Sequence, residues 1–294
     1  MLKKELEIGL QLSIIFIMLS SAIIPMAMAT SKNHIQPINT DEWKKTFGGD
    51  ETDIGYDLKI TDDGYVVIGT TQSKGAGKED IWLIKTDADG TLQWDTTFGG
   101  KNGDIGYAVD QTNDGGFILT GYTWSRTDGK SDVWLIKTDA NGNEEWNTTI
   151  GGTDADIGYD LLQTIDGGYI IVGSTLSEGA GKEDVYLIKT NESGGIQWTE
   201  TYGGSETDVG RSIVQTSSGD FVIVGHTNSY GSGWLDLWII KTDDQGNELW
   251  DTPFGGNKDD VGWAVEETND EGYICTGYTK SFTAQNQDVW LVKF

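Results

Sequence analysis

The chain has 294 residues and a formal net charge of −27 at pH 7, since it carries 47 acidic side chains and only 20 basic ones. Such a charge repels phosphate backbones and anionic lipids, so we expect no nucleic-acid partner. Two His and one Cys argue against a His-rich metal cluster, a Ser-His-Asp triad and a disulfide framework.

The first 29 residues have the pattern of an export signal. Lys3 and Lys4 form a basic start, residues 8–24 are mostly apolar, and Ala27-Met28-Ala29 fits a cleavage site. Residues 30–42 then form a polar linker. We therefore expect a secreted or cell-surface protein. The alternative is that the signal is not cleaved and provides the only link to a membrane.

One unit of about 52 residues recurs from residue 43 to residue 294. Its frame is W-x-x-x-Φ-G-G-x-x-x-D-Φ-G, with Φ apolar or aromatic, followed by an apolar run and by D-Φ-Φ-Φ-Φ-K. The copies begin at Trp43, Trp94, Trp146, Trp198 and Trp250. Five copies at a nearly fixed period predict a repeat architecture, which we assign as one domain over residues 43–294.

Each unit is expected to form four β-strands, because no window shows the i, i+3, i+4, i+7 apolar spacing of a helix. In the third unit we predict the innermost strand over Ile157–Gln163 and the second over Tyr169–Gly173. A loop leads to the third strand, Asp184–Lys189, and a hairpin leads to the outer strand, which begins at Gln197. Antiparallel pairing then places tight turns on one face of the domain and the longer loops on the other. We expect the binding residues on the long-loop face.

The phase of the repeats predicts a closed ring. The sequence enters the repeats with an outer strand, Trp43–Gly49, and leaves them with a third strand, Asp288–Phe294. Pairing these two segments would complete the fifth sheet and leave no open edge. We therefore predict an all-β fold, a five-bladed β-propeller with four-stranded antiparallel blades, in which the N-terminal strand closes the last blade.

A second motif spans the junction between neighbouring units. K-T-D-x-x-G-x-x-x-W occurs at Lys85–Trp94, Lys137–Trp146 and Lys241–Trp250, and Lys189–Trp198 carries Asn191 in place of the Asp. It resembles the tryptophan-docking motif of quinoprotein-type propellers, which implies that each Trp packs between blades. The whole frame is similar to secreted propeller-repeat proteins of bacteria and archaea, a resemblance that implies little about activity. The quinone cofactor is not carried over, because quinoproteins need more blades and a dedicated pocket.

Five recurring aspartates form the candidate metal site. They begin the innermost strands, so their carboxylates are expected to ring one mouth of the central channel, where they would hold a cation such as calcium. The alternative is that each one accepts backbone N–H groups of its own or a neighbouring blade. The set comprises Asp53, Asp104, Asp156, Asp208 and Asp260.

Four aromatic residues have no recurring core position. Trp124 and Trp234 fall in the loops between second and third strands, and Tyr230 and Phe282 join them there. Large aromatic side chains among Ser, Thr and Asp are typical of a surface that stacks on a sugar ring. The alternative is that they cover the bases of the loops.

These features favour a non-catalytic extracellular binding or adhesion propeller, monomeric, with a carbohydrate or a surface protein as its ligand. A purely structural repeat domain is the alternative. A glycan-cleaving enzyme with channel carboxylates ranks third, because no unit carries a unique acidic insertion. We assign no catalytic residue, and we expect Cys275, in an apolar run, to be a buried core residue.

Overall fold

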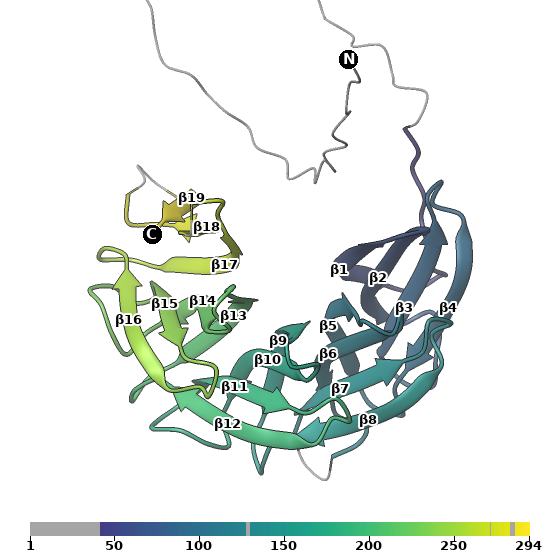
Figure 1. Ribbon diagram of the computed structural model, residues 1–294, viewed down its shortest axis with the longest axis horizontal. Coiled ribbons are helices and arrows are strands. Elements are labelled where there is room, and N and C mark those ends of the chain that lie inside the picture. The colour runs from purple at the N-terminus through teal and green to yellow at the C-terminus, as the bar shows by residue number, and fades with distance from the viewer. Residues whose placement is uncertain (1–41, 128–129, 271, 283–285) are drawn as a thin grey trace, which may run out of the picture. The chain divides into compact units, whose positions relative to one another are not determined.

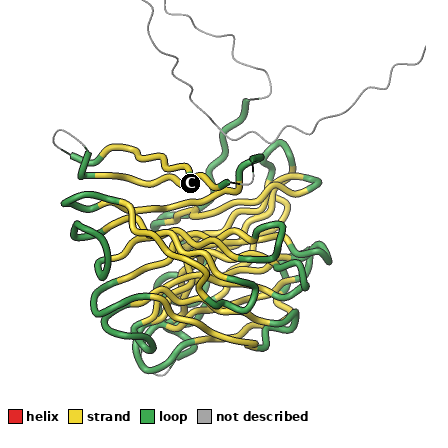
Figure 2. The backbone as a smooth tube through the Cα atoms, turned by 60° about the vertical axis from the view of Figure 1, so that its left-hand side comes forward, coloured by secondary structure: helices red, strands yellow, loops and turns green. Residues whose placement is uncertain are grey.

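The computed structural model describes residues 42–127, 130–270, 272–282 and 286–294, so the expected signal and most of the linker lie outside the described residues. Trp43–Phe294 form one compact unit. The described part of this unit consists of strands and loops (Figure 2). No helix long and apolar enough to cross a membrane occurs in the described ranges.

The strands belong to five consecutive sheets. Their bounds are β1 (Asp53–Thr61), β2 (Gly64–Thr71), β3 (Asp80–Asp87) and β4 (Leu92–Phe98) in sheet one; β5 (Asp104–Gln111), β6 (Phe117–Thr123), β7 (Asp132–Thr138) and β8 (Glu144–Ile150) in sheet two; β9 (Asp156–Gln163), β10 (Tyr169–Thr175), β11 (Asp184–Thr190) and β12 (Ile196–Tyr202) in sheet three; β13 (Asp208–Gln215), β14 (Phe221–Thr227), β15 (Asp236–Thr242) and β16 (Glu248–Phe254) in sheet four; β17 (Asp260–Glu267), β18 (Tyr273–Thr279) and β19 (Asp288–Lys293) in sheet five.

All pairings within the sheets are antiparallel and follow chain order, as in β1-β2-β3-β4. The sheets follow one another along an arc, with β1, β5, β9, β13 and β17 on its inner side (Figure 1). Four sheets have the four antiparallel strands that the sequence predicts. The arrangement is propeller-like, with one sheet per repeat.

The predicted closure of the ring is absent. The fifth sheet has three strands, and residues 42–49 form none, so Trp43–Gly49 does not pair with β19. Trp43 itself packs on sheet one, in the way that Trp94 packs on sheet two: its indole N–H donates to the carbonyl of Ala88 at 3.2 Å, and its ring centroid is 5.9 Å from that of Tyr65. The edge strand β19 is left open, with Val289 85% exposed. The predicted outer strand over Trp43–Gly49 and its pairing with β19 are therefore wrong.

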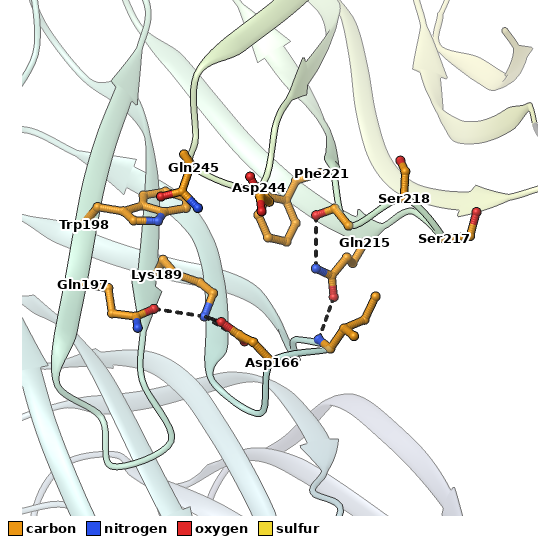
Figure 3. A pocket seen from close by; sticks show the side chains of 12 residues that line it. Asp166, Lys189, Gln197, Trp198, Gln215, Ser217, Ser218, Phe221, Asp244 and Gln245 are labelled. Atoms are coloured by element: carbon orange, nitrogen blue, oxygen red, sulfur yellow. Dashed lines mark hydrogen bonds and ion pairs between the residues drawn. The ribbon is translucent and has the colours of Figure 1, made fainter.

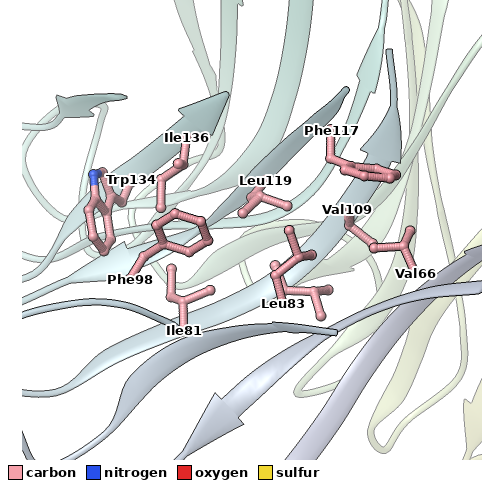
Figure 4. Packing of buried hydrophobic residues seen from close by; sticks show 10 residues of the cluster. Val66, Ile81, Leu83, Phe98, Val109, Phe117, Leu119, Trp134 and Ile136 are labelled. Atoms are coloured by element: carbon pink, nitrogen blue, oxygen red, sulfur yellow. The ribbon is translucent and has the colours of Figure 1, made fainter. Parts of the chain in front are cut away.

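The main apolar layers lie between neighbouring sheets. One cluster joins Ile81 and Leu83 of β3 to Phe117 and Leu119 of β6 and to Trp134 of β7, all at most 1% exposed (Figure 4). In sheets two to four the second and third strands are buried on both faces, because a neighbouring sheet covers each side. Full burial of one such side chain contributes about 1.5–3 kcal/mol. Cys275, as expected, is buried in the layer of the last two sheets.

A tryptophan from the outer strand of one sheet packs on the next sheet. The ring centroid of Trp94 lies 5.9 Å from that of Phe117, and the centroid of Trp146 lies 5.8 Å from that of Tyr169. Gly142 has φ +77°, and a Cβ at this residue would lie 2.5 Å from the Trp94 ring. The glycine of the hairpin is therefore required both by its backbone conformation and by the close approach of the indole.

Candidate functional site

The predicted aspartate ring serves the local loops. Asp104 is buried and accepts the N–H of Gly100 at 2.9 Å and the hydroxyl of Ser125 at 2.6 Å, and Thr123 also donates to it. The glycine and serine donors recur at the four equivalent aspartates. Each carboxylate therefore organises the two loops of its own sheet, which fits the hydrogen-bonding alternative.

At Asp260 these bonds also favour the ionised carboxylate. Burial opposes the ionisation of Asp260, but hydrogen bonds from Ser281 and Thr279 outweigh it and hold the pKa of Asp260 below its ordinary value. In the described ranges no three His, Cys, Asp or Glu side chains are grouped so that they could hold a metal ion. The structure thus does not bring the predicted set together, and calcium binding by it stays a prediction.

A second set of aspartates begins the third strands and meets the first set across each junction. Asp80 accepts the N–H of Ala76 at 2.8 Å, while its buried Oδ1 has no hydrogen-bond partner. Burial raises the pKa of Asp80, and the charge of Asp104 adds to this effect. A Cβ on Gly99 would lie 1.7 Å from Asp80 Oδ1 and 3.0 Å from Asp104 Oδ2. The two carboxylates and Gly99 therefore approach one another closely where sheets one and two meet.

Two of the predicted binding aromatics cover tryptophans of their own sheets. The ring centroid of Tyr230 lies 5.4 Å from that of Trp238, and the centroid of Phe282 lies 5.5 Å from that of Trp290. Basic side chains take the same place in the first two sheets, at 4.8 and 4.7 Å from the indole centroids. This position therefore shields the edge of the core in most repeats, although Tyr230 and Phe282 remain 45% and 65% exposed.

The other two predicted aromatics are exposed in the loops of two different sheets. Trp124 follows β6 in sheet two and Trp234 precedes β15 in sheet four, with exposed fractions of 51% and 75%. Neither of them lines the cavities described below. That Trp124, Tyr230, Trp234 and Phe282 form one binding surface stays a prediction.

The two largest cavities described are grooves between adjacent sheets on the opposite face, where the tight turns lie. The first, of about 600 Å³, lies between sheets three and four, and the second, of about 460 Å³, lies between sheets two and three. Side chains from the turns after β9 and β13 and from the hairpin after β15 line the first groove (Figure 3). The expectation that binding residues lie on the long-loop face stays a prediction.

The polar centre of the first groove is a lysine held in place by its neighbours. Lys189 Nζ lies 2.9 Å from Oδ2 of Asp166 and 3.2 Å from Oε1 of Gln197 (Figure 3). Burial opposes the ionisation of Asp166, but bonds from Thr164 and Lys189 hold its pKa below the usual value. The ion pair therefore persists at neutral pH.

The walls of this groove are partly aromatic and partly amide. Trp198 and Phe221 supply the apolar side. Gln215 is fixed because its Nε2 donates to the carbonyl of Gly219 at 3.1 Å and its Oε1 accepts the N–H of Ile165 at 3.0 Å (Figure 3). An aromatic wall beside oriented amides is the composition expected of a site for a polar small molecule.

The second groove repeats most positions of the first, 52 residues earlier in the chain. Lys137 pairs with Asp114 at 2.9 Å, as Lys189 pairs with Asp166. Trp146 and Tyr169 take the places of Trp198 and Phe221 in the aromatic wall, and Gln163 takes the place of the fixed amide of Gln215. Glu145 takes the place of Gln197 and lies 2.9 Å from Lys137. Sequence reasoning missed these residues, although a lysine at the end of each buried third strand was a signal that a counter-charge must lie beside it.

The chain has distant similarity to known proteins. No family model matches it. Over 196 residues it is 25% identical to the regulatory protein FlaEY of Caulobacter vibrioides, a match that covers 61% of this chain and 20% of that protein. The chain thus spans about a fifth of the curated relative that it matches.

Among solved structures, it is similar to the calcium-binding protein regucalcin of Agrobacterium tumefaciens, at a TM-score of 0.42, 12% identity, and coverage of 78% of this chain and 70% of that one. It is also similar to an endo-1,4-beta-xylanase of Bacteroides thetaiotaomicron, at a TM-score of 0.40, 13% identity, and coverage of 81% and 89%.

Proposed function

We propose that this protein is a non-catalytic binding module in which the five sheets are the blades of a propeller, and that its ligand is a carbohydrate polymer bound in the grooves between blades. The observation that carries this proposal is the repetition of one groove, with the same lysine, aspartate, amide and tryptophan, 52 residues further along the chain. A ligand made of repeating units matches a surface made of repeating grooves, and binding at both sites raises the overall affinity.

The first groove offers contacts that suit sugar hydroxyls. Among the described residues, the indole N–H of Trp198 has no acceptor, and the half-buried ring stands in the wall of the groove. Gln245, Ser217 and Asp244 add donors and acceptors from the turns of sheet four. Tryptophan stacks on the apolar face of a sugar while its N–H and nearby amides bond to hydroxyls, so this set provides both kinds of contact.

The ionisable groups of the grooves support binding rather than hydrolysis. A glycosidase needs one carboxylic acid that stays protonated, and therefore a raised pKa. Burial opposes the ionisation of Asp114, but bonds from Thr112 and Lys137 lower its pKa to about 2. A carboxylate held in this way is ionised at neutral pH and is a poor general acid. Display outside the cell and a monomeric state belong to the same proposal.

The test is a glycan array followed by titration of the best oligosaccharide. The double substitution Gln197→Ala and Gln245→Ala removes two amides from the first groove without touching its core, so binding should weaken severalfold. The control is Gln93→Ala, because Gln93 is the exposed sheet-one counterpart of Gln197 and lines neither groove. Equal loss in the control, or no loss in the double variant, would contradict the proposal.

A further inference from the structure

Every innermost strand contains a β-bulge at its fourth residue. In β13, for example, Gly210 and Ser212 pair with consecutive residues of β14, so the residue between them is unpaired. A bulge re-aims the side chain of the extra residue, and such bulges are frequent beside active sites. The bulged residues, which we call the bulge ring, are Tyr56, Tyr107, Tyr159, Arg211 and Trp263.

The bulge ring lines one cavity of about 330 Å³, to which each sheet contributes this one residue. The ring centroids of Tyr56 and Tyr107 are 5.1 Å apart, and those of Tyr107 and Tyr159 are 5.3 Å apart. The guanidinium of Arg211 lies 4.1 Å from the Tyr159 centroid and 4.9 Å from the Trp263 centroid. The wall is therefore aromatic from sheet one to sheet five, with a single cation in it.

Arg211 has no acceptor for its charge. In the described part of the chain it makes no ion pair and no hydrogen bond, and its buried Nε lacks a partner. The nearest buried base, His226, does not compensate: burial and the charge of Arg211 lower its pKa to about 4, so it is neutral at pH 7. An unpaired guanidinium in a partly buried site costs free energy unless an anion occupies it.

The neighbouring carboxylates are engaged elsewhere. Asp160 Oδ2 accepts the N–H of Ile213 at 3.0 Å, and Asp57 Oδ2 accepts the N–H of Val109 at 3.0 Å, so both bind the backbone of the next sheet. The rings of Tyr159 and Trp263 contact the guanidinium of Arg211. The N–H groups along the edge of the guanidinium are left to form hydrogen bonds in the guanidinium plane. This is the arrangement in which arginine binds a carboxylate with two parallel hydrogen bonds.

We propose that the bulge ring binds a small ligand that joins a carboxylate to a flat or apolar ring face. The carboxylate accepts the edge N–H groups of Arg211, and the ring stacks on Tyr107, Tyr159 or Trp263. The cavity volume falls within the range of about 300–1,000 Å³ that is usual for small-molecule sites. Two sources carry this chemistry, an acidic sugar residue and a free aromatic carboxylate. The site is independent of the grooves between blades.

The test is isothermal titration of the full chain with galacturonate and with benzoate, against the uncharged methyl galactoside and benzyl alcohol. At least one acid should bind tenfold or more tightly than its uncharged analogue, a difference that corresponds to about 1.4 kcal/mol. Binding of galacturonate alone identifies an acidic sugar, and binding of benzoate alone identifies an aromatic acid. If neither acid binds at millimolar concentration, or if acid and analogue bind equally, the proposal is overturned.

The variant Arg211→Tyr installs the residue that sheets one to three carry at this position, so it should fold as the parent does. It should weaken acid binding at least tenfold with an unchanged Tm. Arg211→Lys keeps the charge but loses the two parallel bonds, so its affinity should lie between the two. Undiminished acid binding by Arg211→Tyr would contradict the proposal.

Discussion

The Nζ atom of Lys189 lies 2.9 Å from Oδ2 of Asp166, yet the lysine side chain is 5% exposed and the aspartate is 57% exposed. The lysine is thus a buried charge whose partner reaches it from the surface. The same relationship joins Lys137 to Asp114, at 4% and 60% exposure. The ion pairs place one buried charge at the centre of each groove.

Removal of the aspartate should therefore cost stability. Asp166→Ala leaves the buried ammonium of Lys189 with weaker partners, and we expect the free energy of unfolding to fall by about 2–3 kcal/mol. Glu206→Ala, which breaks the exposed pair with Lys182, is the control and should cost at most about 1 kcal/mol. Urea denaturation of the three proteins measures the difference. Equal effects of the two substitutions would show that the Lys189–Asp166 pair stabilises the fold no more than an exposed ion pair does.

The docking of the outer-strand tryptophans can be tested at a glycine. Gly142 and Gly115 both adopt positive φ, +77° and +84°, but a Cβ at Gly142 would lie 2.5 Å from Trp94, whereas a Cβ at Gly115 has no neighbour within 4 Å. Both alanine variants pay for the backbone strain, about 1 kcal/mol. Gly142→Ala should cost about 1–3 kcal/mol more, because the indole must move. Similar Tm values for the two variants would argue against a tight contact.

The exposed aromatics should divide into two classes. Trp124→Ala and Trp234→Ala should leave the Tm nearly unchanged, because these side chains are exposed in their loops. Tyr230→Ala should lower the Tm by a few degrees, since it loses the bond from its hydroxyl to the Gly203 carbonyl at 2.8 Å and the contact with Trp238. Thermal unfolding followed by circular dichroism distinguishes the classes. A drop of several degrees for either tryptophan would place it in the core.

The stability of the fold should depend on the protonation of Asp160. Burial raises the pKa of this carboxyl to about 6, although bonds from Ile213 and Leu161 partly offset the effect. A pKa raised in the folded state means that protonation favours folding. The contribution of Asp160 to the free energy of unfolding should therefore increase as the pH falls through about 6 and level off near the unfolded value of 3.8.

Asp160→Asn should remove this pH dependence, and because an amide has only one acceptor oxygen it should keep one of the bonds from Leu161 and Ile213 and lose the other. Urea denaturation of both proteins at pH 7, 6 and 5 gives the comparison. The difference between the two proteins is the informative quantity, because protonation elsewhere on so acidic a chain changes both alike. If the free energies of unfolding of the two proteins change with pH in parallel, ionisation of Asp160 does not destabilise the folded state.

Much of the fold was readable from the sequence because the repeat makes each local pattern visible five times. The strand predicted at Tyr169–Gly173 is observed as β10 (Tyr169–Thr175), and the one predicted at Asp184–Lys189 is observed as β11 (Asp184–Thr190). The alternation of apolar and polar residues and the residues that form turns depend only on near neighbours along the chain, so a single sequence is enough to show them. The pairing of Trp43–Gly49 with β19 was predicted wrongly because counting strands does not show whether a segment pairs with a strand far away in the sequence.

The sites were less accessible to sequence reasoning. The grooves form where turns from two repeats meet, and no single 52-residue unit contains both walls. The bulge ring left a trace, since Arg211 stands where other repeats have an aromatic residue, but the sequence does not show that these residues face one cavity. The Asp104 set was recognised as recurrent, whereas its hydrogen bonds to nearby loops required the structure.

The measurement that tests the central claim most directly is NMR mapping of an array-selected oligosaccharide on the labelled protein. The account predicts that amide signals of the turns around Gln197, Ser217 and Gln245 shift, together with their counterparts in the second groove. An array without any binding oligosaccharide would contradict it. So would shifts confined to the loops that carry Trp124 and Trp234, because these lie on the opposite face.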